Sequence, residues 1–561
     1  MEKIWVKNYP KGVPGELTFG NDTLVTLFDK VCKSFPNKPS LGCHGVTLSF
    51  DEVNKYVDSL AMSLINLGIK KGDKVAVIMP NIIQYPLSIF AILKVGGVVV
   101  NVNPLYTASE MEYIIQNAEA KAVIVLDMMA NKLDNIAGTG DLKHVIVTKV
   151  ADVYPLYKRI LFGFVLKYVK KLVPHRNYKG VDFRELVSLS EVQLPKVEIT
   201  KDDLAFIQYT GATTGRPKGA MLSHYNVVSN VKQIHVWLDA QVPDLSRHIV
   251  IDALPLYHIF SLTANLFTFF FAGSENVMIT NPRDTKDVAN TLSRIPFTIF
   301  NGLDTLFNHL LNSKEFLAHK YPTYKYGISG GMATRDTVAT KWHEVTGVTP
   351  GSCYGLTETS PAISMCILND GYEPSVGYPI PSTEVDIRDL KTNQSLNVGE
   401  VGVICVRGPQ VSKGYWKNPE ATAKSFDKDG WFRTGDLGYI DAQGKLYISG
   451  RESELIIVSG FNVYPAELED VLDKIPQVKE CAVIGVPHPD TGEEVVAYLS
   501  LRNKKTITKE EVQAKCREEL AAYKIPRQVV IVNELPKTLV GKVDKKVLKQ
   551  MYFEKGSTNG A

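Results

Sequence analysis

The sequence predicts an α/β fold, with a large N-terminal domain of layered α/β sheets plus a β-rich subdomain, and a small mobile C-terminal α+β domain. Three observations support this fold class. Apolar, strand-like runs alternate with helical periodicity in the first half of the chain. Beyond about residue 375, short strands are separated by Gly, Asn and Pro turns. Beyond residue 450, a compact α-β-β-α-β pattern follows.

The first half contains the clearest strand and helix patterns. The apolar runs at 72–80, 121–126 and 204–209 are short and predict buried strands. Residues 109–120 have apolar spacing near 3.6, which predicts a helix with Ser109 as its N-cap. The alternation of these elements favours a parallel sheet covered by helices.

The longest apolar segment, 259–273, predicts a buried core helix. Ser261, Thr263, Asn265 and Thr268 interrupt it, and a membrane-spanning helix needs about 18 to 20 mainly apolar residues. The first fifteen residues contain charge and proline throughout and have no apolar stretch of signal-peptide length.

The sequence pattern beyond about residue 375 predicts the domain boundaries. The runs 383–389, 401–408 and 444–450 predict short strands of a β-rich subdomain at about 375–449. We therefore expect a large domain over 1–449, a hinge over 450–455 and a small domain over 456–561. The tail after about Tyr552 is rich in Gly, Ser and Asn, and we expect it to fray.

Composition narrows the possible functions. With 561 residues the chain needs two or more domains, and 45% hydrophobic and 22% charged residues are ordinary for a soluble protein. A net charge of +3 argues against a dedicated nucleic-acid binder. The seven cysteines form no CxxC pair, which suits a reducing compartment such as the cytoplasm.

One basic and apolar segment, 154–176, has two interpretations. It mixes aromatic and aliphatic residues with Lys158, Arg159, Lys167, Lys170 and Lys171. A basic amphipathic helix of this kind can lie on the inner face of a cell membrane. The alternative is a helix packed on its own domain with a solvated basic face.

The most informative segment is YTGATTGRPKG, residues 209–219. It follows an apolar strand and combines glycines with threonine hydroxyls and Lys218. A loop with few β-carbons can turn its backbone N–H groups toward phosphate oxygens, and a lysine adds a positive charge. The spacing is not that of a Walker A motif. A Gly/Thr-rich surface turn is the alternative. The candidate phosphate-binding residues are Tyr209, Thr210, Gly211, Thr213, Thr214, Gly215 and Lys218.

Four further clusters carry polar groups suited to a nucleotide. Segment 351–359 offers the ring of Tyr354 and the carboxylate of Glu358, which could hold magnesium near phosphates. Segment 430–436 places Asp436 at an expected strand end, where a carboxylate can accept hydrogen bonds from ribose hydroxyls. Arg451 lies at the domain boundary, and Lys542 lies in segment 535–546. Each cluster alone could equally be structural.

Together these segments resemble a known family. YTGATTGRPKGAMLSH, YGLTE, WFRTGD, SGFNVYPAELE and LPKTLVGK occur in this order, and they are similar to the adenylate-forming superfamily of acyl-CoA synthetases, luciferases and nonribosomal adenylation domains. NVNPLYTASEMEY, PLYHIFSLT, ITNPRD and GFNVYP are similar to bacterial long-chain fatty-acid–CoA ligases in particular. The resemblance covers nearly the whole chain.

The resemblance implies a reaction in two steps, with ATP, Mg²⁺ and coenzyme A. A long-chain fatty acid carboxylate attacks the α-phosphate of ATP, and pyrophosphate leaves. The thiol of coenzyme A then attacks the acyl carbon, and AMP leaves. Such nucleotidyl transfer needs positioning and charge neutralisation more than covalent help from the protein.

The resemblance also assigns roles to residues. Lys542 would bridge the substrate carboxylate and the α-phosphate, and His258 would lie near the reacting carboxyl group. Glu358 and Thr210 would hold magnesium, and the loop from Thr210 to Lys218 would hold the phosphates. The remaining nucleotide contacts would come from Gly330, Gly331, Tyr354, Gly355, Thr357, Asp436 and Arg451. The apolar segment after His258 would line an acyl tunnel, although core packing explains the same composition.

The second step implies domain motion. The small domain would rotate about the hinge, withdraw Lys542, and bring Ser459, Gly460 and Phe461 to the thiol channel. The chain departs from the family pattern in having Ala212 in the loop, Gly450 before Arg451, Ser453 at the hinge, and Leu262 where some relatives have a gate tryptophan.

Two alternative functions stay open at this point. One is an acyl-adenylate ligase that transfers its product to a carrier-protein thiol or an amine. The other is a catalytically weak relative that binds fatty acid or a membrane. The sequence also leaves open whether the chain forms a homodimer.

Overall fold

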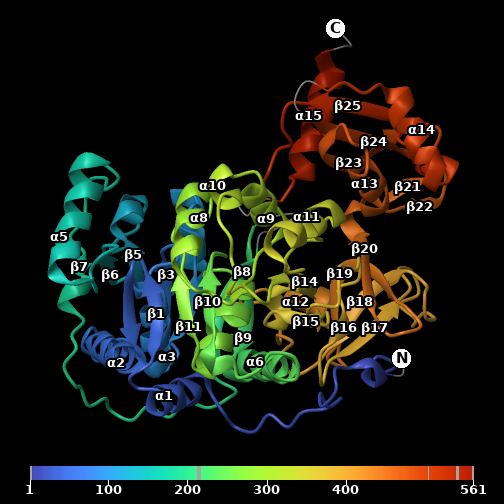
Figure 1. Cartoon of the computed structure of the whole chain (residues 1–561). Coiled ribbons are helices and arrows are strands. Elements are labelled where there is room, and N and C mark those ends of the chain that lie inside the picture. The colour runs from blue at the N-terminus through green and yellow to red at the C-terminus, as the bar shows by residue number, and fades with distance from the viewer. Residues whose placement is uncertain (1–2, 211–215, 503–504, 539–541, 559–561) are drawn as a thin grey trace.

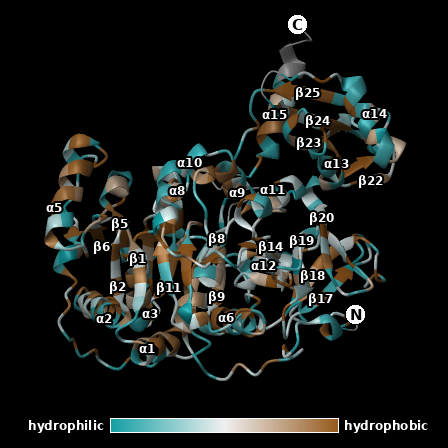
Figure 2. Cartoon of the chain, in the orientation of Figure 1, coloured by the Kyte–Doolittle hydropathy of each residue, from teal (hydrophilic) through white to brown (hydrophobic). Residues whose placement is uncertain are grey.

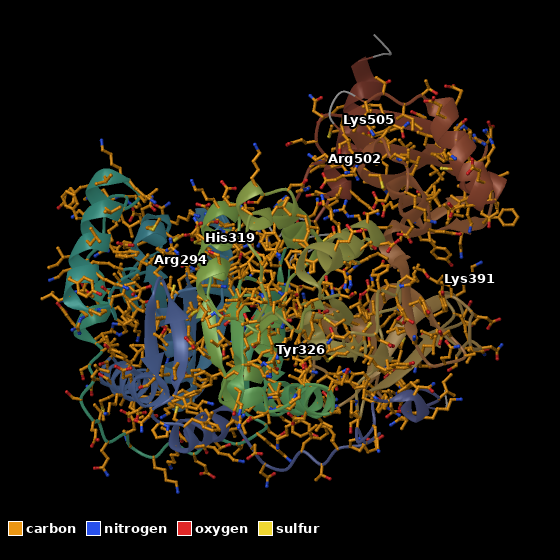
Figure 3. All side chains as sticks on the ribbon, viewed as in Figure 1. Arg294, His319, Tyr326, Lys391, Arg502 and Lys505 are labelled. Carbon is orange, nitrogen blue, oxygen red and sulfur yellow. The ribbon has the colours of Figure 1, made fainter. Side chains whose placement is uncertain are left out.

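The computed structural model describes residues 3–210, 216–502, 505–538 and 542–558. Figure 1 shows two bodies, a large layered part and a smaller C-terminal part placed above one end of it. Side chains fill the space between the layers of the large part (Figure 3).

The largest sheet has seven strands in the order β7-β6-β5-β3-β4-β8-β9. All neighbours are parallel except β8 and β9, which form an antiparallel pair. The predicted strands at 72–80, 121–126 and 204–209 are β3, β5 and β8. The bounds are β3 Lys74–Ile78, β4 Val98–Asn101, β5 Ala120–Leu126, β6 His144–Thr148, β7 Val181–Asp182, β8 Leu204–Thr210 and β9 Lys218–Ser223.

A second sheet has five strands in the order β12-β10-β11-β1-β2, with only β1 and β2 antiparallel. Every residue of α3 from Gln84 to Leu93 is buried, because this helix lies inside the layered core rather than on its surface. The bounds are β1 Pro39–Cys43, β2 Val46–Ser49, β10 Ile249–Asp252, β11 Glu275–Met278 and β12 Ile299–Phe300.

Helices cover and separate these sheets. Several begin with a capping box, in which an N-cap hydroxyl and the side chain three residues later satisfy each other's backbone N–H, as Ser49 and Glu52 do in α2. The bounds are α1 Leu24–Ser34, α2 Phe50–Asn66, α3 Gln84–Lys94, α4 Ala108–Ala118, α5 Leu156–Phe164, α6 His224–Asp239, α7 Thr268–Ala272, α8 Thr285–Arg294, α9 Asp304–Leu311, α10 Lys314–Leu317 and α11 Asp336–Thr346.

Two four-stranded sheets follow, β13-β14-β15-β16 and β17-β18-β19-β20. The predicted strands at 383–389, 401–408 and 444–450 are β17, β18 and β20, and the strand expected to end at Asp436 continues beyond it as the long strand β19. The bounds are β13 Ile328–Ser329, β14 Gly351–Gly355, β15 Ala362–Met365, β16 Tyr378–Pro379, β17 Glu384–Arg388, β18 Gly402–Arg407, α12 Pro419–Ser425, β19 Phe432–Ile440 and β20 Leu446–Arg451.

The C-terminal unit has the predicted α-β-β-α-β order. Its sheet runs β22-β21-β24-β23, with β25 parallel to β24. The unit has its own buried cluster, which includes Ile456, Leu468, Val483 and Leu499. The bounds are β21 Ile456–Val458, β22 Phe461–Val463, α13 Pro465–Asp473, β23 Val478–His488, β24 Gly492–Leu501, α14 Lys509–Glu519, β25 Gln528–Val532 and α15 Lys545–Thr558.

Four details differ from the sequence expectations. The N-cap of α4 is Thr107 rather than Ser109, because the Thr107 hydroxyl accepts from the N–H of Glu110 and Glu110 reciprocates. The segment 259–273 is buried as predicted, but its first part, η6 (Phe260–Phe267), is a π-helix. Helix α15 continues to Thr558, past the point where fraying was expected. Asp436 lies within β19 rather than at a strand end.

The predicted helix in segment 154–176 ends earlier than expected. It comprises α5 and a π-helical turn, η3 (Val165–Val169). Among the described residues, no helix has the length and apolar character to cross a bilayer.

Candidate active site

The last two strands of the largest sheet, β8 and the edge strand β9, bring two predicted phosphate ligands together. In their antiparallel register Thr210 pairs with Lys218, and the Thr210 hydroxyl donates to the Lys218 carbonyl at 3.4 Å. Gly219 has no room for a side chain, because an added Cβ would lie 2.5 Å from Ile207 Cγ2. The predicted ligands Gly211, Thr213, Thr214 and Gly215, and the atypical Ala212, lie outside the described residues.

Tyr415 links Lys218 to the predicted magnesium ligand Glu358. Its phenol donates to Glu358 Oε1 at 2.7 Å, and the Lys218 ammonium lies 5.3 Å from the centre of its ring. Glu358 stands on the short turn η7 (Thr357–Thr359) and is buried. Burial raises the pKa of Glu358, while the Tyr415 hydrogen bond and the charge of Arg451 oppose the rise.

Sequence reasoning missed Tyr415. It lies in the segment KGYWKNP, between β18 and α12, far in sequence from both Glu358 and Lys218. The available signal was only an aromatic residue in a polar loop. The pairing of Ala220 with Tyr415 brings that loop against β9.

Asp436 is the centre of a second cluster. In the register of β19 with β20 it pairs with Arg451, whose Nε lies 2.8 Å from Asp436 Oδ1. The Tyr354 hydroxyl donates to the other carboxylate oxygen at 2.6 Å. Burial raises the pKa of Asp436, and Arg451, Tyr354 and Lys542 counteract it. The structure thus gathers the predicted adenine and ribose residues.

Small residues allow the backbone to approach this cluster. Ser329 pairs in parallel with Ser352, which places Gly330 and Gly331 beside the strand that carries Tyr354. An added Cβ on Gly330 would lie 2.6 Å from Cys353 Sγ, and one on Gly355 would lie 2.0 Å from the Pro361 carbonyl oxygen. Both positions therefore require glycine.

Lys542 reaches this site from the C-terminal unit. The carbonyl of Lys542 accepts from the N–H of Thr538 at 2.7 Å, and its own N–H donates to the Thr538 hydroxyl at 3.2 Å, so Lys542 is held by Thr538. Loss of hydration and the charge of Arg451 lower the pKa of Lys542, and Asp436 and Glu454 act in the opposite direction. These four charges therefore lie close together.

His258 also feels the charge of Lys542. Loss of hydration and the charge of Lys542 lower the pKa of His258 to about 4, so the ring is neutral at pH 7. The Phe260 N–H donates to His258 Nδ1 at 3.3 Å. This contact assigns the ring proton to Nε2, which is then a hydrogen-bond donor.

Buried amides hold the loop that carries His258, and the sequence analysis did not predict them. Asn81 Nδ2 donates to the carbonyls of Asp252 and Leu254, and Asn81 Oδ1 accepts from the N–H of Leu256, each at 2.8 Å. Gln208, on β8, donates to the carbonyl of Tyr257 at 2.7 Å. These contacts set the position of the His258 loop relative to β8.

Polar contacts also connect the two parts of the chain. Arg335 pairs with Asp304 at 2.7 Å and donates to the Lys479 carbonyl at 3.4 Å. At the expected hinge, Glu452 pairs with Arg433 at 3.0 Å, and Glu454 pairs with Lys545 at 2.9 Å.

Several predicted residues lie elsewhere. Ser459 and Gly460 form the turn between β21 and β22, and Phe461 begins β22, on the side of the C-terminal unit that points away from β8 in Figure 1. The exposed ring of Phe461 stacks on Tyr523 at 4.9 Å. Tyr209 is buried in the core, and its phenol donates to Asn117 at 2.6 Å. Thr357 begins the turn that carries Glu358.

The arrangement suits a nucleotide with a metal ion. A buried carboxylate, a threonine hydroxyl and a lysine surround the place where phosphates would lie, and Mg²⁺ is usually bound by one or two carboxylates together with substrate phosphates. In the described part of the chain, no group of three or more His, Cys, Asp or Glu side chains forms a metal site by itself.

Comparison with known families and proteins supports the same assignment. The family of AMP-binding enzymes matches residues 28–416, and the AMP-binding enzyme C-terminal domain matches residues 467–542. The chain is 41% identical over 564 residues to a long-chain-fatty-acid–CoA ligase of Haemophilus influenzae, covering 99% of each chain. It is 34% identical to the enzyme of that name from Bacillus subtilis, again covering 99% of each.

Solved structures agree in fold. ATP-bound MatB from Rhodopseudomonas palustris superposes with a TM-score of 0.81 at 30% identity, covering 94% of this chain and 99% of that one. The o-succinylbenzoate CoA synthetase MenE of Bacillus subtilis, in complex with its acyl-adenylate intermediate, superposes with a TM-score of 0.78 at 26% identity.

Proposed function

Since the chain belongs to the AMP-binding enzyme family of adenylate-forming ligases, we propose that it joins a long-chain fatty acid to coenzyme A with the cleavage of ATP to AMP and pyrophosphate. The relatives that share about 40% identity over the whole chain carry this activity in their names. The buried carboxylate of Asp436, held by both Arg451 and Tyr354 and influenced by the charge of Lys542, is the observation that best supports it.

In the first step, a fatty-acid carboxylate oxygen forms a bond to the α-phosphorus, and the bond to the pyrophosphate oxygen breaks. Lys542 offsets the negative charge that builds on both reactants, and Asp436 keeps the ammonium protonated. The Nε2–H of neutral His258 donates to the carboxylate and orients it. A neutral ring avoids placing a second positive charge beside Lys542.

The phosphate end is held by a separate group. Lys218 and the Thr210 hydroxyl would bind the departing pyrophosphate, and Glu358 and Thr210 would hold Mg²⁺. When bound, the metal neutralises phosphate charge. Tyr415 fixes both Glu358 and Lys218 and so sets the geometry of this end.

In the second step, the coenzyme A thiolate sulfur forms a bond to the acyl carbon, AMP leaves, and the thiol proton passes to solvent. Residues 1–449 would act as one domain and 456–561 as another, with 450–455 as the hinge. Strand β20 ends at Arg451 and β21 begins at Ile456, which leaves a short connection. Gly450, at a φ of +146°, would absorb the backbone change as Ser459, Gly460 and Phe461 move to the thiol.

The test separates the two steps. Lys542→Ala should lower acyl-adenylate formation by about 10²- to 10³-fold, the cost of removing one transition-state charge donor. Transfer from supplied acyl-adenylate to coenzyme A should stay near the wild-type rate. Pyrophosphate release with palmitate measures the first step, and thioester formation measures the second.

Lys546→Ala is the matched control, because Lys546 is exposed on the same segment and stands on α15. Equal loss of both steps in Lys542→Ala would contradict the division of labour. If AMP were released with a carrier-protein thiol or an amine but not with coenzyme A, coenzyme A would not be the acyl acceptor.

We further propose that the protein works in the cytoplasm and associates peripherally with the inner face of the cell membrane, where long-chain acids partition. A homodimer is a separate proposal, which sedimentation velocity over a range of protein concentrations tests.

A further inference from the structure

Helix α5 and the turn η3 present an apolar face to solvent. Figure 1 places α5 at the edge of the large part, and Figure 2 colours much of it as hydrophobic. Tyr157 is 68% exposed, Ile160 64% and Phe164 57%. The exposed large apolar side chains of this surface, here the α5 face, are Leu156, Tyr157, Ile160, Leu161, Phe164, Tyr168, Val169 and Leu172.

The attachment of α5 to the protein leaves this face uncovered. Phe162 packs between Tyr154, at a ring distance of 5.7 Å, and His44, at 5.5 Å. The Lys158 ammonium donates to the carbonyl of Gly45 at 2.7 Å. The segment therefore packs Phe162 and Leu166 on the domain and exposes a second set of apolar side chains to solvent, where an ordinary surface helix presents polar ones.

Charge distribution indicates what covers the face. Between residues 153 and 181 the chain has Lys or Arg at 158, 159, 167, 170, 171, 176 and 179, and it has no Asp or Glu. Lys167, Lys170 and Lys171 are exposed at the end of the apolar stripe. Apolar side chains flanked by lysines match the boundary between acyl chains and anionic headgroups.

We propose that the α5 face docks on a bilayer that contains anionic lipid, with α5 in the plane of the surface and Lys167, Lys170 and Lys171 against the headgroups. This inference rests on the proposed function and names the surface that serves it. A second copy of the chain fits less well, because a twofold contact would bring the same lysines of both copies into one interface.

Docking has a consequence for substrate supply. Long-chain acids partition into bilayers, so an enzyme held on the surface meets them at a higher local concentration than one in solution. Loss of docking should therefore raise the KM for palmitate in vesicles. It should leave the reaction with palmitate supplied on albumin unchanged, because the α5 face is separate from the residues placed in the active site.

The experiment uses the full chain and vesicles of phosphatidylcholine with or without phosphatidylglycerol. Ile160→Ser with Phe164→Ser should weaken vesicle binding by about tenfold or more, because two large side chains no longer enter the acyl boundary. Lys167→Gln, Lys170→Gln and Lys171→Gln together should weaken binding to the anionic vesicles by about a hundredfold, at roughly fivefold per lysine. This charge effect should disappear at high salt.

Leu317→Ser with Val398→Ser is the matched control, since both side chains are exposed and apolar but lie outside α5. Flotation measures binding, and the albumin assay shows that each variant is folded and active. Vesicle binding unchanged in the serine variant would overturn the proposal. A dimer that forms with rising concentration and is lost in the serine variant would also overturn it, because a second copy would then cover the face.

Failure of this inference differs from failure of the proposed function. If the wild-type protein forms palmitoyl-CoA from albumin-bound palmitate but does not bind anionic vesicles, only the docking surface is wrong. If it binds vesicles but forms no thioester with any presentation of the acid, the proposed function is wrong.

Discussion

Tyr415→Phe tests whether a residue outside every recognised motif sets the metal and phosphate end of the site. The change removes one hydroxyl, which donates to Glu358 Oε1 at 2.7 Å. It keeps the aromatic ring that lies 5.3 Å from the Lys218 ammonium. The variant therefore isolates the hydrogen bond to Glu358 from the contact with Lys218.

The expected magnitude follows from the environment of Glu358. A hydrogen bond to a charged group contributes about 1.5–3 kcal/mol. Each 1.36 kcal/mol in a transition state changes a rate tenfold, so we expect kcat/KM for adenylation to fall by about 10- to 100-fold.

The pH dependence has a defined sign. Glu358 must be ionised to hold the metal, so activity falls as pH drops through its pKa. Burial already raises that pKa, and Tyr415 opposes the rise. Without the hydroxyl the pKa rises further, and the acid limb of the activity profile moves to higher pH.

The assay is pyrophosphate release with palmitate, measured against Mg²⁺ concentration at a series of pH values. Tyr439→Phe is the control, because Tyr439 stacks on Tyr447 at 4.8 Å and is not among the residues placed in the site. A Tyr415→Phe enzyme with the Mg²⁺ dependence and pH profile of the wild type would refute the role of this hydroxyl.

Three further predictions concern buried and charged groups. Burial raises the pKa of Asp252 to about 8, above its unfolded value near 4, so the protonated carboxyl favours the folded state at low pH and this stability is lost as pH rises from about 4 toward 8. Asp252→Asn should therefore raise Tm at pH 8 and lose this advantage toward pH 4, as measured by differential scanning calorimetry. Asn81→Ala should reduce the free energy of unfolding in urea by about 2–4 kcal/mol, because it leaves backbone groups of Asp252, Leu254 and Leu256 unsatisfied. Asn81→Ala should also lower the adenylation rate. An unchanged free energy of unfolding would contradict the role of Asn81 in holding the loop that carries His258. Lys542 acts in its charged form, and its pKa is lowered. The adenylation rate should therefore decline with rising pH at a lower pH than that at which a free lysine loses its proton. A rate that stays constant over this pH range would contradict the role of the Lys542 charge.

Local patterns were sufficient for most of the elements. Strand β8 follows from a mainly apolar run, and β5 follows from its β-branched residues, because both are buried between layers. The C-terminal order from α13 to β25 follows from the switch between helical and strand periodicity. The end of β19 was placed too early, at Asp436, because Arg433, Thr434, Gly435 and Asp436 interrupt its apolar pattern.

Part of the site could also be predicted from local sequence patterns. Lys218, Glu358, Asp436 and Lys542 lie in segments of distinctive sequence, so a resemblance could assign each of them a role. It could not supply Tyr415, Asn81 or Gln208, because their importance comes from contacts across the fold. Asn81, for example, holds backbone atoms more than 170 positions away in the chain.

The sequence by itself determined the composition of each element and the motifs that can meet phosphate, ribose and carboxylate, because these depend on local backbone freedom and side-chain chemistry. Only the tertiary structure decided which of these groups share a site, and which pKa values are shifted by burial and neighbouring charge. It also decided which side of α5 packs on the protein, because the sequence pattern of 154–176 does not distinguish the inner face of the helix from the outer one. The contacts of Lys158 and Phe162 with the β1–β2 turn leave the exposed apolar side chains in solvent.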